Sequence, residues 1–287
     1  MSFSLTSDGA TDQANLRMIF ERDGEKTILA ESFSCMPFRA FPPFYARSRG
    51  CAYTYMVNPT PGLLGGDRVQ VEIALRQGAH AFITSPAATK VLKASRDRAE
   101  QTTHITVSDG ATIEYVPAYV IPFGGARFKQ KTVVHMERTS TCLVLDWFTT
   151  GRTGRGESLV FDEYDNSTIL VCENEPVVYD RFILRPKNEE YRALGRLESS
   201  TVSASLYLMH NRSDLPKTLV EGVREALGEE ASLAGVSTIG SKGLVVRVMG
   251  QAMPPVQKSV VRVIKVIRRM VLAIEHEEIP DRLLNAL

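Results

Sequence analysis

The sequence predicts a mainly β fold, built as stacked sheets, a sandwich or an irregular β-solenoid, with two C-terminal helices packed against the sheets. From about residue 16 to 184, apolar and polar residues alternate between turn signals, which is the pattern of half-buried strands. A strand–turn–strand pattern occurs twice, and helical periodicity begins only after residue 210. We therefore predict one domain over 1–287, with a β-rich body at 16–210 and a mixed α/β part at 211–287.

The strand–turn–strand pattern is clearest in VEIALRQGAHAFITSPA and THITVSDGATIEYVPA. Both run from a strand through a polar residue and Gly-Ala into a second strand, and then reach Pro-Ala. Gly78 and Gly110 lie 32 residues apart, and repetition at this period is typical of stacked strand units. Further strands are predicted in FKQKTVVHM, TCLVLDWF, STILVC, VVYDRFIL and GLVVRVMG.

Two helices are predicted near the C-terminus. The first begins near Asp214 and Pro216 and ends at Gly228, with its apolar face formed by Leu219, Val223 and Leu227. The second follows Pro254 and Pro255. Its apolar stripe has helical spacing and comprises Val260, Val263, Ile264, Ile267, Met270, Val271 and Ile274.

The second helix carries a basic face of Lys258, Arg262, Lys265 and Arg269. Such a face occurs on helices that bind membranes or nucleic acids, and also as the solvated side of a helix docked on a sheet. The net charge of +1, from 34 basic and 33 acidic residues, favours the solvated side, as does the lack of interleaved aromatic residues. We predict neither a nucleic-acid nor a membrane partner. With no signal peptide or bilayer-length apolar run, we expect a cytoplasmic protein.

The segment NPTPGLLGGD, Asn58 to Asp67, predicts a loop with a tightly specified shape. Proline fixes φ, and glycine adopts conformations that other residues avoid. A phosphate-binding loop would need a strand before it and a helix after it, whereas Asp67 is followed by the strand pattern of residues 68–75. We therefore predict a structural role for the loop.

Catalytic and metal-binding motifs are absent from the sequence. The cysteines and the histidines lack the short spacings that place two metal ligands on one element, so we predict free thiols, mostly buried, and no metal site. No nucleophile elbow, Walker motif or kinase signature occurs. The residues concerned are Cys35, Cys51, Cys142 and Cys172, with His80, His104, His135, His210 and His276.

Acids and hydroxyls beside stiff turns are the remaining candidates for chemistry. Asp146 lies within LDWFTTGR, where burial of both strand faces would also bury its carboxylate. A buried carboxylate needs a partner, and Arg152 or Arg155 is the nearest in sequence. Alternatively, such acids line an internal polar path that attracts a divalent cation. The whole group is Asp67, Thr84, Ser85, Glu114, Asp146, Glu157 and Asp180.

Several motifs, in order, resemble the urease accessory protein family UreD, also called UreH. They are PFRAFPPFY (37–45), NPTPGLLGGD (58–67), GAHAFITSPAATKV (78–91), GATIEYVPAYVIPF (110–123), LDWFTTGRTGRGE (145–157) and VYDRFIL (178–184). Several ordered motifs of this length are far more specific than one glycine-rich loop.

The resemblance implies a non-enzymatic chaperone that docks on apo-urease and holds UreF, which recruits the GTPase UreG. Nickel would pass transiently through the scaffold, with no tightly bound cofactor. By position in the motifs, channel or interface residues are expected at Asp67, Thr84, Ser85, Lys90, Asp146 and Asp180. Structural roles are expected in the loops for Gly62, Gly65, Gly66, Arg152, Gly156 and Glu157. The rival hypothesis is a hydrolase on a β-solenoid or sandwich, with Asp67, Asp146 and Glu157 as acid, base or metal ligands.

Overall fold

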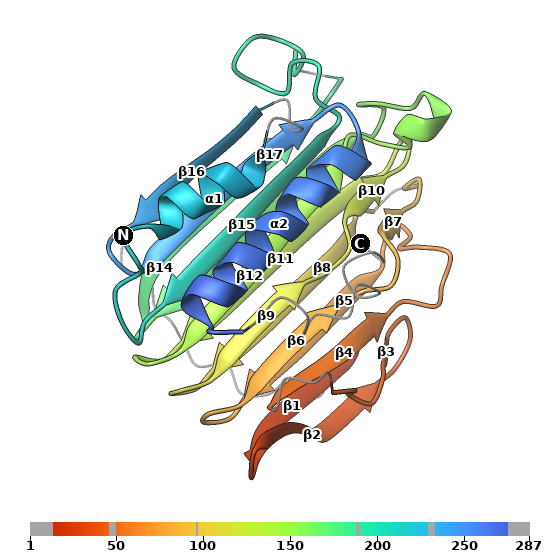
Figure 1. Ribbon diagram of the computed structural model, residues 1–287. Coiled ribbons are helices and arrows are strands. Elements are labelled where there is room, and N and C mark those ends of the chain that lie inside the picture. The colour runs from red at the N-terminus through yellow and green to blue at the C-terminus, as the bar shows by residue number, and fades with distance from the viewer. Residues whose placement is uncertain (1–13, 46–49, 96, 188–189, 229–232, 275–287) are drawn as a thin grey trace.

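Two β-sheets face each other, and two helices cover the outer face of one of them (Figure 1). The structure is a computed structural model that describes residues 14–45, 50–95, 97–187, 190–228 and 233–274. The predicted mainly β fold with two C-terminal helices is confirmed. His276 and both ends of the predicted 1–287 domain lie outside the described residues.

One sheet has seven strands. Its order is β14 (Glu175–Leu184), β13 (Glu163–Cys172), β11 (Arg127–Met136), β8 (Ala99–Val107), β5 (Arg68–Leu75), β1 (Leu16–Asp23) and β2 (Lys26–Ser34). The five inner strands are parallel, whereas β14 and β2 are antiparallel to their neighbours at the two edges.

The other sheet has ten strands. Its main order is β16 (Leu233–Ile239), β17 (Gly243–Gly250), β15 (Val202–His210), β12 (Thr141–Thr149), β9 (Thr112–Val116), β6 (His80–Thr84), β4 (Cys51–Val57) and β3 (Arg39–Ala40). The short strands β10 (Val120–Pro122) and β7 (Thr89–Val91) extend from β12 off this path. A 3-10 turn, Thr153–Arg155, follows β12.

The repeated strand–turn–strand pattern is real, and it forms a coil. The pairs β5–β6, β8–β9 and β11–β12 each pass from the seven-stranded to the ten-stranded sheet, and their turns stack. The amide of Gly78 donates to the Asp109 carbonyl (3.1 Å), and the amide of Thr141 donates to the Ala111 carbonyl (2.9 Å). The sequence revealed two of these three units, because the third turn, at residues 137–140, has no Gly-Ala.

The coil ends where the chain folds back within one sheet. Glu173 and Asn174 both have positive φ, 47° and 69°, and they turn β13 directly into antiparallel β14. Positive φ at both central residues matches the twist of a tight hairpin. The chain then returns to the ten-stranded sheet as β15, antiparallel to β12.

Alternation along each strand separates two apolar cores. In β12, Val144 and Phe148 face the seven-stranded sheet, whereas Leu145 and Trp147 belong to the core under the helices. Asp146 shares the side of Val144 and Phe148, since residues two apart on a strand point the same way. A carboxylate therefore interrupts the apolar packing between the two sheets.

The helices α1 (Leu219–Leu227) and α2 (Met253–Val271) pack on the ten-stranded sheet and on each other. Both helices are confirmed, but their bounds differ from the prediction: α1 begins at Leu219, later than the predicted start near Asp214 and Pro216, and α2 differs at both ends. The helix includes Pro254 and Pro255 in its first turn, where proline is tolerated because those amides have no helical partner. It ends before Ile274, because Ala273 has a left-handed φ of 53°.

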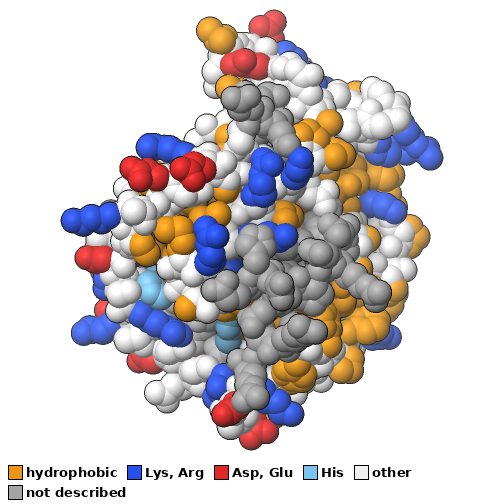
Figure 2. All heavy atoms as spheres, in the orientation of Figure 1, with side chains coloured by type: hydrophobic (Ala, Val, Ile, Leu, Met, Phe, Trp, Pro, Cys, Tyr) orange, Lys and Arg blue, Asp and Glu red, His pale blue; other side chains and the backbone are white. Residues whose placement is uncertain are grey.

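The basic face of α2 is partly structural. Arg262 donates from Nε to the carbonyl of Ala226 (2.7 Å) and from Nη2 to that of Leu227 (3.0 Å), at the C-terminal end of α1. Lys258 and Arg269 are exposed. On the face in Figure 2, basic side chains are spread among apolar and acidic ones. Within the described ranges, no helix has the length and apolarity that a membrane span requires.

Candidate functional site

A group of polar residues lies between the two sheets, and we call it the inner polar layer. The ten-stranded sheet contributes Asp146, Ser205 and Arg247, which are cross-strand neighbours on β12, β15 and β17. The seven-stranded sheet contributes Asn166, Thr168 and Asp180, with Thr168 opposite Asp180. Each of these positions points toward the facing sheet because of strand alternation.

Asp146 is held by neutral donors. Asn166 Nδ2 and Thr168 Oγ1 both donate to its Oδ2 atom, the latter at 3.2 Å. Burial raises the pKa of Asp146 to about 6, although the two hydrogen bonds act in the opposite direction. Among the described residues, no Lys or Arg forms an ion pair with this carboxylate. Asp146 is therefore a buried carboxylate that forms no ion pair, although the charge of Arg247 also lowers its pKa and that of Asp180 raises it.

Asp180, the second acid of the layer, has a cationic partner. Tyr207 donates its hydroxyl to Asp180 Oδ2, and Arg247 Nη2 lies 2.6 Å from the same oxygen. Burial, together with the hydrogen bond to Asp180, raises the pKa of Tyr207. The Arg247 side chain is 57% exposed, so this ion pair lies where the inner polar layer meets solvent.

Other polar groups continue the layer along the coil. Tyr164 donates its hydroxyl to Gln130 Oε1 at 3.2 Å. The side-chain oxygens of Gln101 and Asn166 are buried, and no group in the described part of the chain bonds to them. Buried polar atoms of this kind are normally satisfied by ordered water or an ion. The inner polar layer therefore contains oxygens that can accept hydrogen bonds or bind a cation.

Only two of the six predicted channel or interface residues, Asp146 and Asp180, lie in the inner polar layer. Asp67 accepts the Leu64 amide at its Oδ2 (2.8 Å) and closes its own loop. Lys90 is exposed on β7. Thr84 and Ser85 are buried at the end of β6, and no described group bonds the Thr84 hydroxyl.

The predicted pairing of Asp146 with Arg152 or Arg155 is wrong, since Asp146 is bonded by Asn166 and Thr168 and Arg155 is exposed. Arg152 donates from Nε to Glu157 Oε2 (2.7 Å), and its guanidinium lies over the ring of Phe123. The turn after β12 closes on itself, so its arginine meets the acid five residues later. The turn includes Gly156, which has a left-handed φ of 75°.

The glycine-rich loop packs tightly against neighbouring segments. A Cβ on Gly62 would lie 2.6 Å from the Lys90 carbonyl oxygen, and one on Gly65 would lie 2.4 Å from that of Asp97. Gly66 has a positive φ of 94°. The backbone of this loop therefore contacts neighbouring segments closely, which only glycine permits.

A second polar group, which we call the Arg268 cluster, lies between the ten-stranded sheet and α2. Arg268 is 1% exposed, and its Nη1 atom donates to both oxygens of Glu114 (3.0 and 2.9 Å). Its Nη2 atom donates to the Tyr53 hydroxyl (2.6 Å). His80 Nε2 lies 2.8 Å from Glu114 Oε1, and Cys51 completes the cluster.

The Arg268 cluster shifts the pKa of both its acid and its histidine. Burial would raise the pKa of Glu114, but Arg268 and His80 outweigh it and lower that pKa. Burial would lower the pKa of His80, but Cys51 and Glu114 raise it to about 10. Sequence reasoning missed this cluster because its residues come from four distant elements. One signal was present: Arg268 lies on the predicted apolar stripe, four residues after Ile264.

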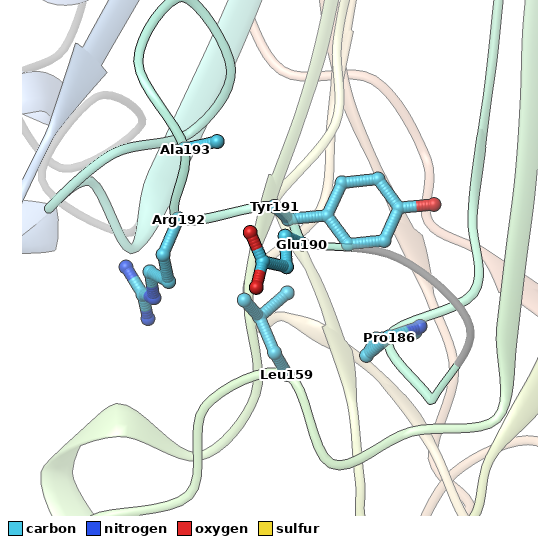
Figure 3. A pocket seen from close by; sticks show the side chains of 6 residues that line it. All are labelled: Leu159, Pro186, Glu190, Tyr191, Arg192 and Ala193. Carbon is cyan, nitrogen blue, oxygen red and sulfur yellow. The ribbon is translucent and has the colours of Figure 1, made fainter.

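Two surface depressions lie outside both polar groups. One, of about 430 Å³, is lined by Leu159, Pro186, Glu190, Tyr191, Arg192 and Ala193 (Figure 3). The Arg192 side chain points away from the Tyr191 ring there, and the Tyr191 hydroxyl accepts the amide of Arg185 (2.9 Å). The other depression adjoins the glycine-rich loop and is lined by Gly66, Arg68, Asp97, Arg98, Glu100 and Arg127.

Comparison with known proteins assigns the family. The sequence profile described as UreD urease accessory protein matches residues 12–282. The chain belongs to the UreD family of urease accessory proteins. UreD of Actinomyces naeslundii is 31% identical over 229 residues, which cover 80% of this chain and 84% of the relative. UreD of Lachnoclostridium phytofermentans is 25% identical over 247 residues, covering 85% and 89%, and UreD of Bacillus cereus is 27% identical over 240 residues, covering 83% and 86%.

Membership of the UreD family confirms the resemblance found in the motifs. These relatives are named as urease accessory proteins, so the chain belongs to a family of accessory proteins and not of enzymes. The hydrolase hypothesis is therefore wrong. The structure agrees, because Asp67, Asp146 and Glu157 have separate partners: a loop amide, two side chains between the sheets, and Arg152.

Proposed function

We propose that this UreD protein promotes nickel insertion into apo-urease, as a scaffold in a complex with UreF and the GTPase UreG. Family membership supports a role in urease maturation. Nickel would be a transient cargo, and GTP hydrolysis on UreG would supply the free energy for its release. The use of GTP favours the cytoplasm as the place of action.

The environment of Asp146 is the observation that best supports a path for nickel through the protein. Its carboxylate faces the other sheet, is bonded by Asn166 and Thr168, and forms no ion pair among the described residues. Carboxylate, amide and hydroxyl oxygens bind divalent cations but hold nickel less tightly than nitrogen or sulfur ligands do. A cation could therefore bind briefly beside Asp146 and move on.

Asp180 supplies a second acid at the edge of the same layer. Its ion pair with Arg247 (2.6 Å) lies where the side chain of Arg247 is 57% exposed. An exposed pair of this kind is weak and exchanges readily. We infer that a cation could replace Arg247 beside Asp180 as it enters or leaves the layer.

The test is urease activation in a defined mixture of apo-urease, UreF, UreG, GTP, nickel and this protein. Asp146→Asn removes the charge with little change of shape, so we expect the complex to assemble and nickel loading to fall several-fold. The matched control is Asp165→Asn, since Asp165 also lies on a buried strand of the sandwich but pairs with Arg181 (2.9 Å). We expect the control to activate urease normally.

Two results would count against the proposal. If Asp146→Asn loads nickel as fast as the unsubstituted protein, Asp146 has no role in the path. If the protein does not co-purify with UreF and apo-urease, the scaffold role fails, whatever the inner polar layer does.

A further inference from the structure

Three side chains of the Arg268 cluster offer different metal ligands at one point. The sulfur of Cys51, a ring nitrogen of His80 and a carboxylate oxygen of Glu114 all lie within 4.8 Å of one another. We propose that Cys51, His80 and Glu114 form a binding site for one borderline divalent cation, of which zinc is the commonest in proteins. This site lies between the ten-stranded sheet and α2, apart from the inner polar layer.

The β-sheet fixes the three ligands in place. They come from the adjacent parallel strands β4, β6 and β9, with Cys51 directly opposite His80. Glu114 lies two residues beyond Thr112, the partner of His80, so it is a diagonal neighbour on the same face. Ligand atoms around tetrahedral zinc are about 3.3 to 3.8 Å apart. Small side-chain rotations on a rigid sheet therefore suffice to close the site.

The set of ligands selects the class of metal. Thiolate and imidazole favour zinc, cobalt or nickel over magnesium and calcium, which prefer oxygen ligands alone. Three protein ligands leave a fourth position open for water or another donor. The His80 side chain is 18% exposed whereas that of Glu114 is fully buried, so a cation would enter past His80.

Arg268 already contacts Glu114, and its positive charge would repel a cation. The geometry nevertheless leaves a lone-pair site on Glu114 for a metal ion. A carboxylate offers about four lone-pair sites, and Glu114 uses three of them for its contacts with His80 and Arg268. Metal binding would also replace the contact between His80 and Glu114 Oε1, which frees a second lone-pair site on the carboxylate. Arg268 would remain as an outer partner that orients Glu114, as hydrogen-bonded groups behind metal ligands commonly do.

The experiment is a titration of the full-length protein, made without a histidine tag, with zinc and with cobalt(II). We expect about one metal ion per chain, a thiolate-to-cobalt charge-transfer band and a higher melting temperature with zinc. Cys51→Ala should abolish the band and weaken binding about a hundredfold. The control Cys142→Ala removes a buried thiol from the other face of the same sheet. It should keep both the charge-transfer band and the binding affinity.

A second pair of variants shows whether a loss of metal binding comes from the loss of a ligand or from misfolding. His80→Gln should lose binding to a similar extent, whereas His104→Gln, on the outer face of the seven-stranded sheet, should not. The inference is overturned if no stoichiometric binding occurs, or if Cys51→Ala or His80→Gln binds as tightly as the unsubstituted protein.

Discussion

The inner polar layer and the Arg268 cluster both bury a carboxylate, but in opposite electrostatic settings. Asp146 is bonded by the uncharged side chains Asn166 and Thr168, and burial raises its pKa to about 6. Glu114 lies between Arg268 and His80, which lower its pKa despite complete burial. One carboxylate lacks a cation, and the other already has two cationic partners.

The difference indicates what each region can do. A carboxylate with cationic partners on both sides stabilises the folded state, because removal of either partner without a replacement leaves a buried charge. A carboxylate without a cation destabilises the folded state at neutral pH, and a passing dication would relieve that cost. The two regions thus predict opposite effects of similar substitutions.

The largest expected effect is the loss of Arg268. Arg268→Met leaves Glu114 buried beside His80 alone, so we expect the free energy of unfolding in urea to fall by about 3 to 5 kcal/mol. Arg247→Met is the control in the other region. Its guanidinium is more than half exposed, so we expect a loss of about 1 kcal/mol or less. Similar losses for the two variants would show that the two regions do not differ in how strongly their ion pairs stabilise the fold.

The next effect is a gain in stability. The raised pKa of Asp146 means that the folded state binds this proton more tightly than the unfolded state, so stability is lost as the pH rises from about 4 to 6. Asp146→Asn should therefore stabilise the protein at pH 7 by up to about 3 kcal/mol, and the gain should vanish near pH 4. Urea unfolding at several pH values measures this.

Glu114→Gln is the matched substitution for that pH series. We expect it to change the free energy of unfolding in the opposite direction to Asp146→Asn. The lowered pKa of Glu114 contributes stability above the unfolded pKa, which is lost as the pH falls through the folded pKa. Glu114→Gln should destabilise the protein at pH 7. A stabilising Glu114→Gln, or a destabilising Asp146→Asn, would contradict the assignment of the two environments.

Removal of either of two tyrosine hydroxyls should have a smaller effect on stability. Tyr53→Phe removes the acceptor of Arg268 Nη2 and leaves a buried charged donor without a partner, so we expect a loss of about 1 to 3 kcal/mol. Tyr207→Phe removes a donor to Asp180, which keeps Arg247, so we expect about 1 kcal/mol or less. Thermal unfolding of both variants gives the order, and a reversed order would show that Tyr207 matters more than the ion pair.

The smallest effect concerns the hydrogen bond from Thr168. Thr168→Val removes one donor from Asp146 at nearly constant shape, so stability should change by about 1 kcal/mol or less. The pKa of Asp146 should rise above its present value, because a bond to the charged form is lost. Carboxyl NMR titration measures that pKa, and an unchanged value would mean that Asn166 alone holds the acid.

Much of the fold could be predicted, because strands and helices are encoded by local periodicity. Alternation located β11, β12, β14 and β17, and helical spacing located α2. It also placed Asp146 on a buried face. Periodicity cannot reveal strand order, so the third unit of the coil and the pairing of the two sheets emerged only from the structure.

The partners of the buried charges could not be predicted for the same reason. Asp146 meets Asn166 across the two sheets, although Arg152 is closer in sequence. Arg268 meets Glu114 across 154 residues, on a helix whose other basic residues are at least partly accessible to solvent. Long-range contacts depend on topology, and a local rule such as the nearest opposite charge fails there.

The stacked coil has a consequence for the dimensions of the interior. Each strand–turn–strand unit adds one strand to both sheets, and neighbouring strands are about 4.8 Å apart. The space between the sheets thus grows in whole steps of that size, at constant width. A homologue with one extra unit between β9 and β11 would therefore have an interior that is longer by about 4.8 Å.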